Sequence, residues 1–350
     1  MISSQHRLST QPAIRAYEAF SAPGFSFNSK FLNEAFGGTG LKRGFVSEIC
    51  GAPGMGKTSL SLALTANALL SGTRVLWIET CHPIPLSRLR ALLQSQVPSS
   101  QEEDNLSSTL DEYLQLLDVY YAPYLANLLV YLKSFDDDSN LDDVGLIIID
   151  NLSMPIQLAF PTCPDDYAYL RQRRNTSSRK TSMDSLGKEN MNSGIEKEVA
   201  SKELDEPFPN SQTNLNKRKR VVGEISSILS RIAATYQIAI LVTTQMTSKV
   251  VTGMGAKLIP FLSNNWLDKV SSRLVLYCRH PTENDKFVDN SESNLSYQSL
   301  RYAYMAKQLP GISIDSELVF QVTENGLMDC RSLPINSSQR RKRSLMETDL

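Results

Sequence analysis

The amino-acid sequence predicts an α/β fold with a mainly parallel central sheet and a β-rich C-terminal end. Short apolar runs, typical of buried strands, alternate with segments of helical spacing as far as residue 244. Beyond residue 270 the helical segments give way to strand-like segments alone. Because parallel strands need a crossover connection, usually a helix, this alternation indicates a parallel sheet.

The first half of this pattern precedes residue 135. Residues 45–50 form a short apolar run, and residues 59–70 form a helical segment rich in leucine and alanine. Gly72 ends that helix, and the apolar run at 73–79 predicts the next strand. Leucines at helical spacing predict a helix at 86–93. The same signals predict a helix at 106–117, a strand at 118–122 and a helix at 124–134.

The second half begins with the apolar run at 144–150, which is typical of a central parallel strand and ends in a carboxylate. An apolar face predicts an amphipathic helix at 221–236, and residues 238–244 read as another buried strand. A stretch rich in Gly, Ser and Asn, which we expect to be mobile, follows to about residue 265. The last predicted strands lie at 272–278, 300–306 and 318–322.

Composition bounds the class of protein. The 350 residues are 41% hydrophobic, which is enough for a sizeable core. The charge is balanced, with 36 Lys and Arg against 37 Asp and Glu. Any affinity for nucleic acid must therefore come from local basic patches. The five cysteines form no CxxC pair and the three histidines are scattered, so neither a zinc site nor a disulfide framework is indicated. With no signal peptide or membrane-length apolar run, we expect a soluble intracellular protein that does not bind membranes.

We expect one domain with irregular flanks. Residues 1–36 are predicted to form a flexible N-terminal arm, residues 37–330 the domain, and residues 331–350 a basic tail. The polar segment at 161–220 lacks periodicity and is predicted to be a disordered insertion. Basic clusters at residues 217–220 and 340–343 could be nuclear import signals, phosphate contacts or simply solvated charge.

The turn after the first strand fits the pattern G-x-x-x-x-G-K-[ST]. Lying between a strand and a helix N-terminus, it predicts a cradle for the phosphates of a nucleoside triphosphate. The lysine would meet the β- and γ-phosphates, and the threonine hydroxyl would join the shell of Mg²⁺. The predicted binding residues are Gly51, Ala52, Pro53, Gly54, Met55, Gly56, Lys57, Thr58 and Ser59. A glycine-rich turn that merely joins a strand to a helix is the alternative.

Asp150 ends the apolar run at 144–150. A carboxylate at the C-terminal edge of such a strand, opposite a phosphate cradle, is the Walker B arrangement and would hold Mg²⁺ through water. The alternative is an aspartate that caps the following turn.

The order of these motifs resembles the RecA-like recombinase family, and within it the eukaryotic paralogues that assist the strand-exchange recombinase. The resemblance runs from about residue 37 to residue 327, interrupted by the insertion. It implies a RecA-like core that binds ATP and Mg²⁺. It also implies that Arg88 lies against adenine, although an exposed helical arginine is equally consistent, and that Gln245 is the sensor of the γ-phosphate. Residues 246–265 would then be the second DNA loop, with Lys249 and Lys257 as phosphate contacts.

The sequence departs from the family where the attacking water is activated. After the second strand, Glu79 takes the first acidic position, but Cys81 takes that of the catalytic carboxylate. Losing a general base typically costs about 10²–10⁴-fold in rate, so we expect weak hydrolysis unless a shifted turn lets Glu79 substitute. No N-terminal helical DNA-binding domain or clear F-x-x-A motif is evident, which disfavours long filaments of this chain alone.

The resemblance therefore implies a nuclear, ATP-binding mediator of homologous recombination and double-strand break repair. Its partners would be a second paralogue in a heterodimer, the strand-exchange recombinase and single-stranded DNA. An efficient DNA-stimulated ATPase motor and a nucleotide-independent scaffold subunit are the alternatives.

Overall fold

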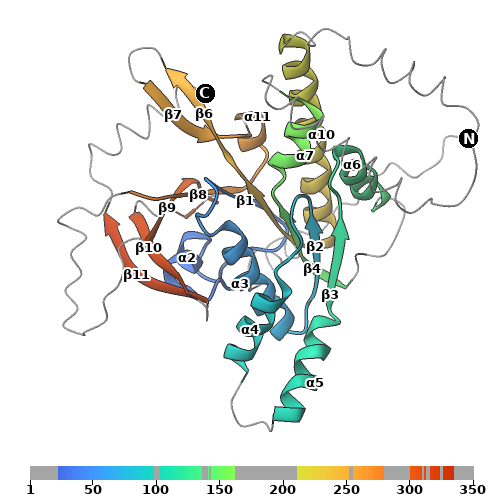
Figure 1. Ribbon diagram of the computed structural model, residues 1–350, viewed down its shortest axis with the longest axis vertical. Coiled ribbons are helices and arrows are strands. Elements are labelled where there is room, and N and C mark those ends of the chain that lie inside the picture. Colours follow the sequence, from blue (N-terminus) through green and yellow to red (C-terminus); the bar gives the residue numbers. More distant parts are fainter. Residues whose placement is uncertain are drawn as a thin grey trace, which may run out of the picture.

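A nine-stranded sheet forms the centre of the molecule in the computed structural model (Figure 1). The structure describes residues 23–97, 103–135, 141, 143–161, 211–251, 255–262, 264–279, 300–309, 311–312, 316–323 and 326–334. The strand order is β11-β10-β9-β8-β1-β5-β4-β2-β3. The strands are β1 (Val46–Gly51), β2 (Arg74–Glu79), β3 (Leu117–Tyr121), β4 (Val144–Asp150), β5 (Ala239–Thr244), β8 (Ser272–Tyr277), β9 (Leu300–Lys307), β10 (Ser316–Thr323) and β11 (Gly326–Pro334).

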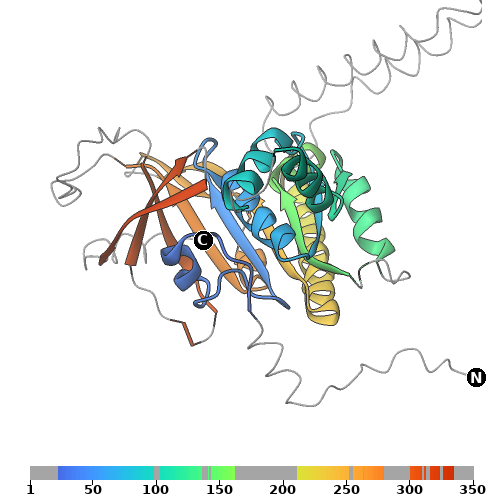
Figure 2. The ribbon, with the colours of Figure 1, turned by 90° about the horizontal axis from the view of Figure 1, so that it is seen from below.

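The sheet is parallel from β8 to β3 and antiparallel from β8 to β11. Figures 1 and 2 show the antiparallel strands at one end of the sheet and β3 at the other. The predicted α/β class, with a mainly parallel sheet and a β-rich C-terminal end, is thus confirmed. The crossover segments provide the physical reason, because they carry the helices that cover both faces of the parallel part.

Two apolar clusters fill the space between the sheet and its helices. Along β4, Ile148 belongs to one cluster while Ile147 and Ile149 belong to the other, as the alternation of a strand requires. One cluster is covered by α2 (Lys30–Ala35), α3 (Lys57–Leu70), α4 (Leu86–Gln96) and α5 (Glu103–Leu114). The other is covered by α6 (Leu125–Ser134), α7 (Ser153–Ala159), α10 (Ser211–Tyr236) and α11 (Asn264–Leu267). Within the described part of the chain, no helix is both long and apolar enough to cross a membrane.

The predicted flexible arm at residues 1–36 is wrong for its last fourteen residues, numbers 23–36. Phe27 and Leu32 are fully buried in the first cluster, and Ser29 caps α2 by accepting a hydrogen bond from the backbone N–H of Leu32. Phe31, Leu32, Ala35 and Phe36 do follow helical spacing, but α2 has only six residues, which is too short a pattern to identify a helix from the sequence. Residues 1–22 lie outside the described part.

Three further boundaries differ from the prediction. Helix α10 begins at Ser211, inside the predicted insertion at 161–220, so the basic cluster at 217–220 is helical; residues 162–210 lie outside the described part. Strand β11 extends into the predicted tail at 331–350 because it pairs with β10. The stretch after residue 245 contains an antiparallel hairpin of β6 (Met246–Val251) and β7 (Gly255–Pro260).

Candidate functional site

The first part of the site is the glycine-rich turn between β1 and α3. Gly51 ends β1, and Ala52, Pro53 and Met55 lie in the turn that follows. The turn is tight because two of its glycines, Gly54 and Gly56, adopt left-handed φ angles of 77° and 95°. Gly56 is the N-cap of α3, and no side chain of the described residues caps it. The N–H groups of the first helical turn, at the positive end of the helix dipole, are therefore left for an anion.

A cavity of about 430 Å³ lies over this turn, which is within the usual range for ligand sites. It is lined by Gly54, Gly56, Lys57, Thr58, Ser59, Arg88, Arg301 and Val322. Three of these side chains are cationic and none is acidic. A Cβ at Gly56 would stand 3.1 Å from a methyl carbon of Val322, so the close approach of the turn also requires glycine. The residues present thus fit a polyphosphate.

Lys57 points back into the turn. Its Nζ donates to the carbonyl oxygens of Gly51 at 2.7 Å and Ala52 at 3.0 Å. Burial lowers the pKa of the Lys57 ammonium, while the negative charge of Asp150 acts in the opposite direction. A partly desolvated cation gains from an added anionic partner, because its charge is not screened by water.

The other two cations come from distant parts of the chain. Arg88 of α4 donates to the carbonyl oxygen of Thr323 at 3.5 Å, and so lies against the end of β10. Arg301 of β9 donates through Nε to the carbonyl oxygen of Gly54 at 3.3 Å. The sequence predicted Arg88 from the resemblance, but nothing near Arg301 signals its place, since it lies 247 residues from Gly54.

The carboxylate of Asp150 joins the cradle. Its Oδ2 accepts a hydrogen bond from Thr58 Oγ1 at 3.1 Å, so the two residues predicted to serve Mg²⁺ are in contact. Its Oδ1 accepts from Thr243 Oγ1 at 2.6 Å, and Thr243 in turn accepts from the backbone N–H of Asn151 at 2.7 Å. Thr243 was not predicted as a site residue. It reaches Asp150 because β5 pairs with β4 in the sheet.

Glu79 lies beside Asp150, since the two residues are partners in the β2–β4 pair. Its side chain is 8% exposed, and its Oε1 accepts a hydrogen bond from the backbone N–H of Ile84 at 2.6 Å. This carboxylate therefore holds the loop that follows β2. Cys81, in the same loop, is partly exposed.

Gln245 joins the end of β5 to the start of the β6–β7 hairpin. Its backbone N–H donates to Ser153 Oγ of α7 at 2.9 Å. Its carbonyl oxygen accepts from the backbone N–H of Phe261 at 3.0 Å, which closes the base of the hairpin. Lys249 and Lys257 are directly opposite each other across the two strands. The predicted sensor Gln245 therefore lies at the base of the predicted DNA loop, where its backbone closes the hairpin.

Comparison of the amino-acid sequence with those of known proteins identifies the family of this chain. The chain is 61% identical to the DNA repair protein rhp55 of Schizosaccharomyces pombe over 353 aligned residues, which cover 100% of both chains. This chain belongs to the RecA-like recombinase family, as a recombinase paralogue. A shorter match, 32% identical over 59 residues, links 17% of the chain to 25% of the DNA repair and recombination protein RadB of Methanobrevibacter smithii. No family model matches the chain.

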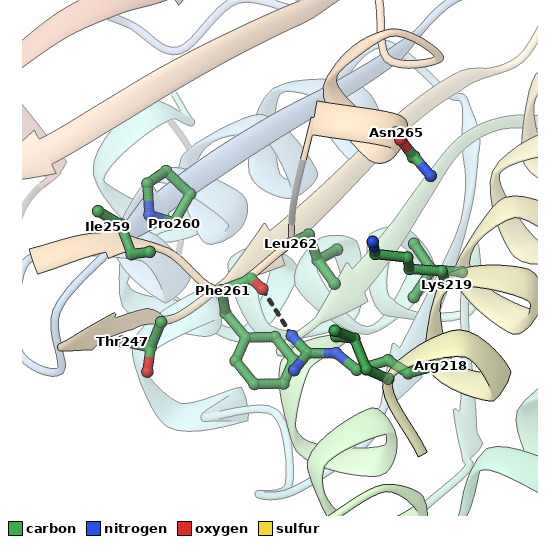
Figure 3. A pocket seen from close by; sticks show the side chains of 10 residues that line it. Arg218, Lys219, Thr247, Ile259, Pro260, Phe261, Leu262 and Asn265 are labelled. Carbon is green, nitrogen blue, oxygen red and sulfur yellow. Dashed lines mark hydrogen bonds between the residues drawn. The ribbon is translucent and has the colours of Figure 1, made fainter. Parts of the chain in front are cut away.

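In this paralogue the base of the hairpin is also bound to α10 (Figure 3). The Arg218 guanidinium lies over the Phe261 ring, 3.9 Å from its centroid, and donates to the Phe261 carbonyl oxygen at 2.7 Å. Burial lowers the pKa of Arg218. A cavity of about 200 Å³ lies at this point, and Lys219 and Asn265 line it together with Arg218 and Phe261. The basic cluster at 217–220 therefore stands next to the hairpin.

Proposed function

We propose that this chain binds ATP with Mg²⁺ at the cradle and acts as a mediator of homologous recombination. The observation that carries the proposal is the contact between Thr58 and Asp150 beside an uncapped helix N-terminus and three cations. A hydroxyl and a carboxylate are the hard oxygen ligands that Mg²⁺ prefers.

Each residue would have a separate role in holding the nucleotide. Lys57 and Arg301 would offer positive charge to the phosphates, and Arg88 would lie against the adenine. Thr58 and Asp150 would hold Mg²⁺, which when bound neutralises charge on the phosphate oxygens. Thr243 keeps the Asp150 carboxylate oriented by its 2.6 Å hydrogen bond.

Hydrolysis is proposed to be slow. Glu79 is largely buried, and one of its oxygens already holds the backbone N–H of Ile84, while position 81 carries a thiol. These observations support a nucleotide that mainly sets the shape of the hairpin and of a subunit interface. An efficient motor would need Glu79 to be released or a base supplied by a partner. A nucleotide-independent scaffold would leave the uncapped cradle without a use.

The relatives support the cellular role. Rhp55 is named as a DNA repair protein, and RadB as a DNA repair and recombination protein. We therefore propose that the chain works in the nucleus, in a heterodimer with a second paralogue, and stabilises the strand-exchange recombinase on single-stranded DNA. Lys249 and Lys257 of the hairpin are the proposed DNA phosphate contacts, because the two cations are paired across its strands.

The test measures nucleotide binding and turnover by the purified chain, with and without single-stranded DNA. We expect tight Mg–ATP binding, with a turnover at least about 100-fold below the typical ~10 s⁻¹ of enzymes. Lys57→Ala should weaken binding strongly, whereas the exposed Lys30→Ala should not. Brisk, DNA-stimulated turnover would favour the motor instead. Full stabilisation of the recombinase on DNA by Lys57→Ala would favour the scaffold.

A further inference from the structure

A second carboxylate, Glu48, lies in the middle of β1 and is fully buried. Both of its oxygens are occupied. Oε1 accepts a hydrogen bond from Thr244 Oγ1 at 2.6 Å. Oε2 accepts from Trp266 Nε1 at 2.9 Å and from Arg273 Nε at 2.6 Å. None of these four residues lines the phosphate cavity.

The partners of Glu48 come from both ends of the hairpin. Thr244 is the last residue of β5 and immediately precedes Gln245. Trp266 lies in α11, shortly after β7 ends. Arg273 of β8 also donates to the carbonyl oxygen of Leu262 at 3.2 Å, only two residues beyond β7. One side chain of the phosphate-binding strand therefore holds the entry and the exit of the β6–β7 hairpin.

The last two residues of β5, Thr243 and Thr244, each donate a hydrogen bond to a different carboxylate. β5 lies between β1 and β4, and Thr243 binds Asp150 of β4 whereas Thr244 binds Glu48 of β1. A shift of the cradle relative to the sheet would therefore reach the hairpin from two sides. Close-packed protein interiors have low compressibility and transmit strain, so such a shift is passed along these hydrogen bonds.

Stability alone is a weak reason for this arrangement. A buried ion pair such as Glu48–Arg273, both at most 2% exposed, often contributes less than well-packed apolar residues would. Its value lies in fixing one geometry, since each donor must meet a particular oxygen. We propose that Glu48 is a positioning residue that couples the nucleotide cradle to the β6–β7 hairpin. The inference rests on the proposed function, because it takes the cradle as a nucleotide site and the hairpin as a DNA contact.

The sharpest variant is Thr244→Val. Valine keeps the β-branched shape but removes the hydroxyl that joins the hairpin entry to Glu48. Its matched control is Thr65→Val, since Thr65 is also fully buried and donates one hydrogen bond, at 2.9 Å to the carbonyl oxygen of Ser61. Glu48→Gln is less useful, because it leaves Arg273 buried without its counter-charge and can prevent folding.

Coupling is measured as the ratio of single-stranded DNA affinity with and without a slowly hydrolysed ATP analogue. Couplings between sites typically reach about 5–150-fold, and we expect the wild type and Thr65→Val to share a ratio in that range. Thr244→Val should bind the analogue within about 3-fold of wild type, yet its ratio should fall towards one. An unchanged affinity ratio in Thr244→Val would overturn the inference. So would a Thr244→Val variant that loses stability and nucleotide affinity but keeps the wild-type affinity ratio.

A second readout separates this inference from the proposed function. Amide exchange of β6 and β7 with and without the analogue reports the coupling even if DNA does not bind. We expect the analogue to slow exchange in the wild type and to have little effect in Thr244→Val and in Trp266→Phe, which loses the indole donor but keeps an aromatic ring. If the wild type does not bind the analogue, the proposed function fails and the inference with it. If all chains bind and respond alike, the inference alone fails.

Discussion

Replacing Thr243 by valine tests how the Asp150 carboxylate is held. Thr243 is fully buried, donates to Asp150 Oδ1 at 2.6 Å and accepts from the backbone N–H of Asn151 at 2.7 Å. Valine fills nearly the same volume, so the change removes two hydrogen bonds without opening a cavity. A hydrogen bond to a charged group contributes about 1.5–3 kcal/mol, and an orphaned buried amide costs about 1–3 kcal/mol. Because Asp150 is partly exposed, water can replace some of this, and we expect a net loss of about 2–4 kcal/mol.

Urea denaturation followed by circular dichroism gives the change in the free energy of unfolding. Thr65→Val, which removes a single neutral hydrogen bond, should lose only about 1 kcal/mol. Thr243→Val should also weaken nucleotide binding more in the presence of Mg²⁺ than in its absence, because the carboxylate is no longer oriented. A loss no larger than that of Thr65→Val, together with unchanged Mg²⁺ dependence, would refute the reasoning.

Three further predictions concern the cradle, its strand and the hairpin. Gly54→Ala should destabilise the fold by about 1–2 kcal/mol in urea denaturation, through its positive φ alone. Gly56→Ala should be more destabilising, because its Cβ would also lie 3.1 Å from a methyl carbon of Val322 in β10. Burial, and secondarily the charge of the neighbouring Glu48, raises the pKa of the Cys50 thiol. The thiol therefore ionises more readily in the unfolded chain than in the folded one. Wild type should keep its stability advantage over Cys50→Ala below about pH 8.5 and lose at most about 1.4 kcal/mol of it per pH unit above that. Arg218→Lys keeps the charge but loses the stack on Phe261, so amide exchange at the base of the hairpin should become faster.

Each of these has an outcome that contradicts it. Equal destabilisation by the two glycine variants would mean that the contact with β10 is absent. A difference between wild type and Cys50→Ala that does not change with pH would mean that the thiol ionises equally in the folded and unfolded chain. Unchanged exchange in Arg218→Lys, compared with the exposed Arg220→Lys as control, would show that charge alone holds the hairpin base.

The sheet could be predicted because its signal is local. Each strand predicted between residues 45 and 322 is present. The buried parallel strands read as continuous apolar runs, and β9 and β10 are rich in aromatic and β-branched residues that favour strands. The elements that were missed are those without such a run. Helices α2 and α11 have 6 and 4 residues, too few to show a period, and the β6–β7 hairpin mixes lysine, serine and glycine with its apolar residues.

The candidate site divides in the same way. The glycine-rich turn could be identified because its residues are consecutive, and Asp150 was placed opposite it because a carboxylate that ends an apolar strand is typical of the Walker B arrangement. Thr243, Arg301 and Glu48 have no linear signal. Thr243 and Glu48 reach their partners because β5 lies between β1 and β4, and Arg301 reaches Gly54 from β9, which β8 separates from β1. No spacing along the chain encodes such neighbours.

The wall that Arg301 and Val322 add to the phosphate cavity has a consequence for how the protein is made. The glycine-rich turn leaves the ribosome early, whereas β9 and β10 are translated some 250 residues later. A nascent chain therefore carries the complete glycine-rich turn long before it carries Arg301 and Val322 of the cavity. A chain truncated before residue 300 would keep the glycine-rich turn but would lack Arg301 and Val322 of the cavity wall. If the cradle binds nucleotide as proposed, immobilised nucleotide should retain such a chain less well than the full-length one.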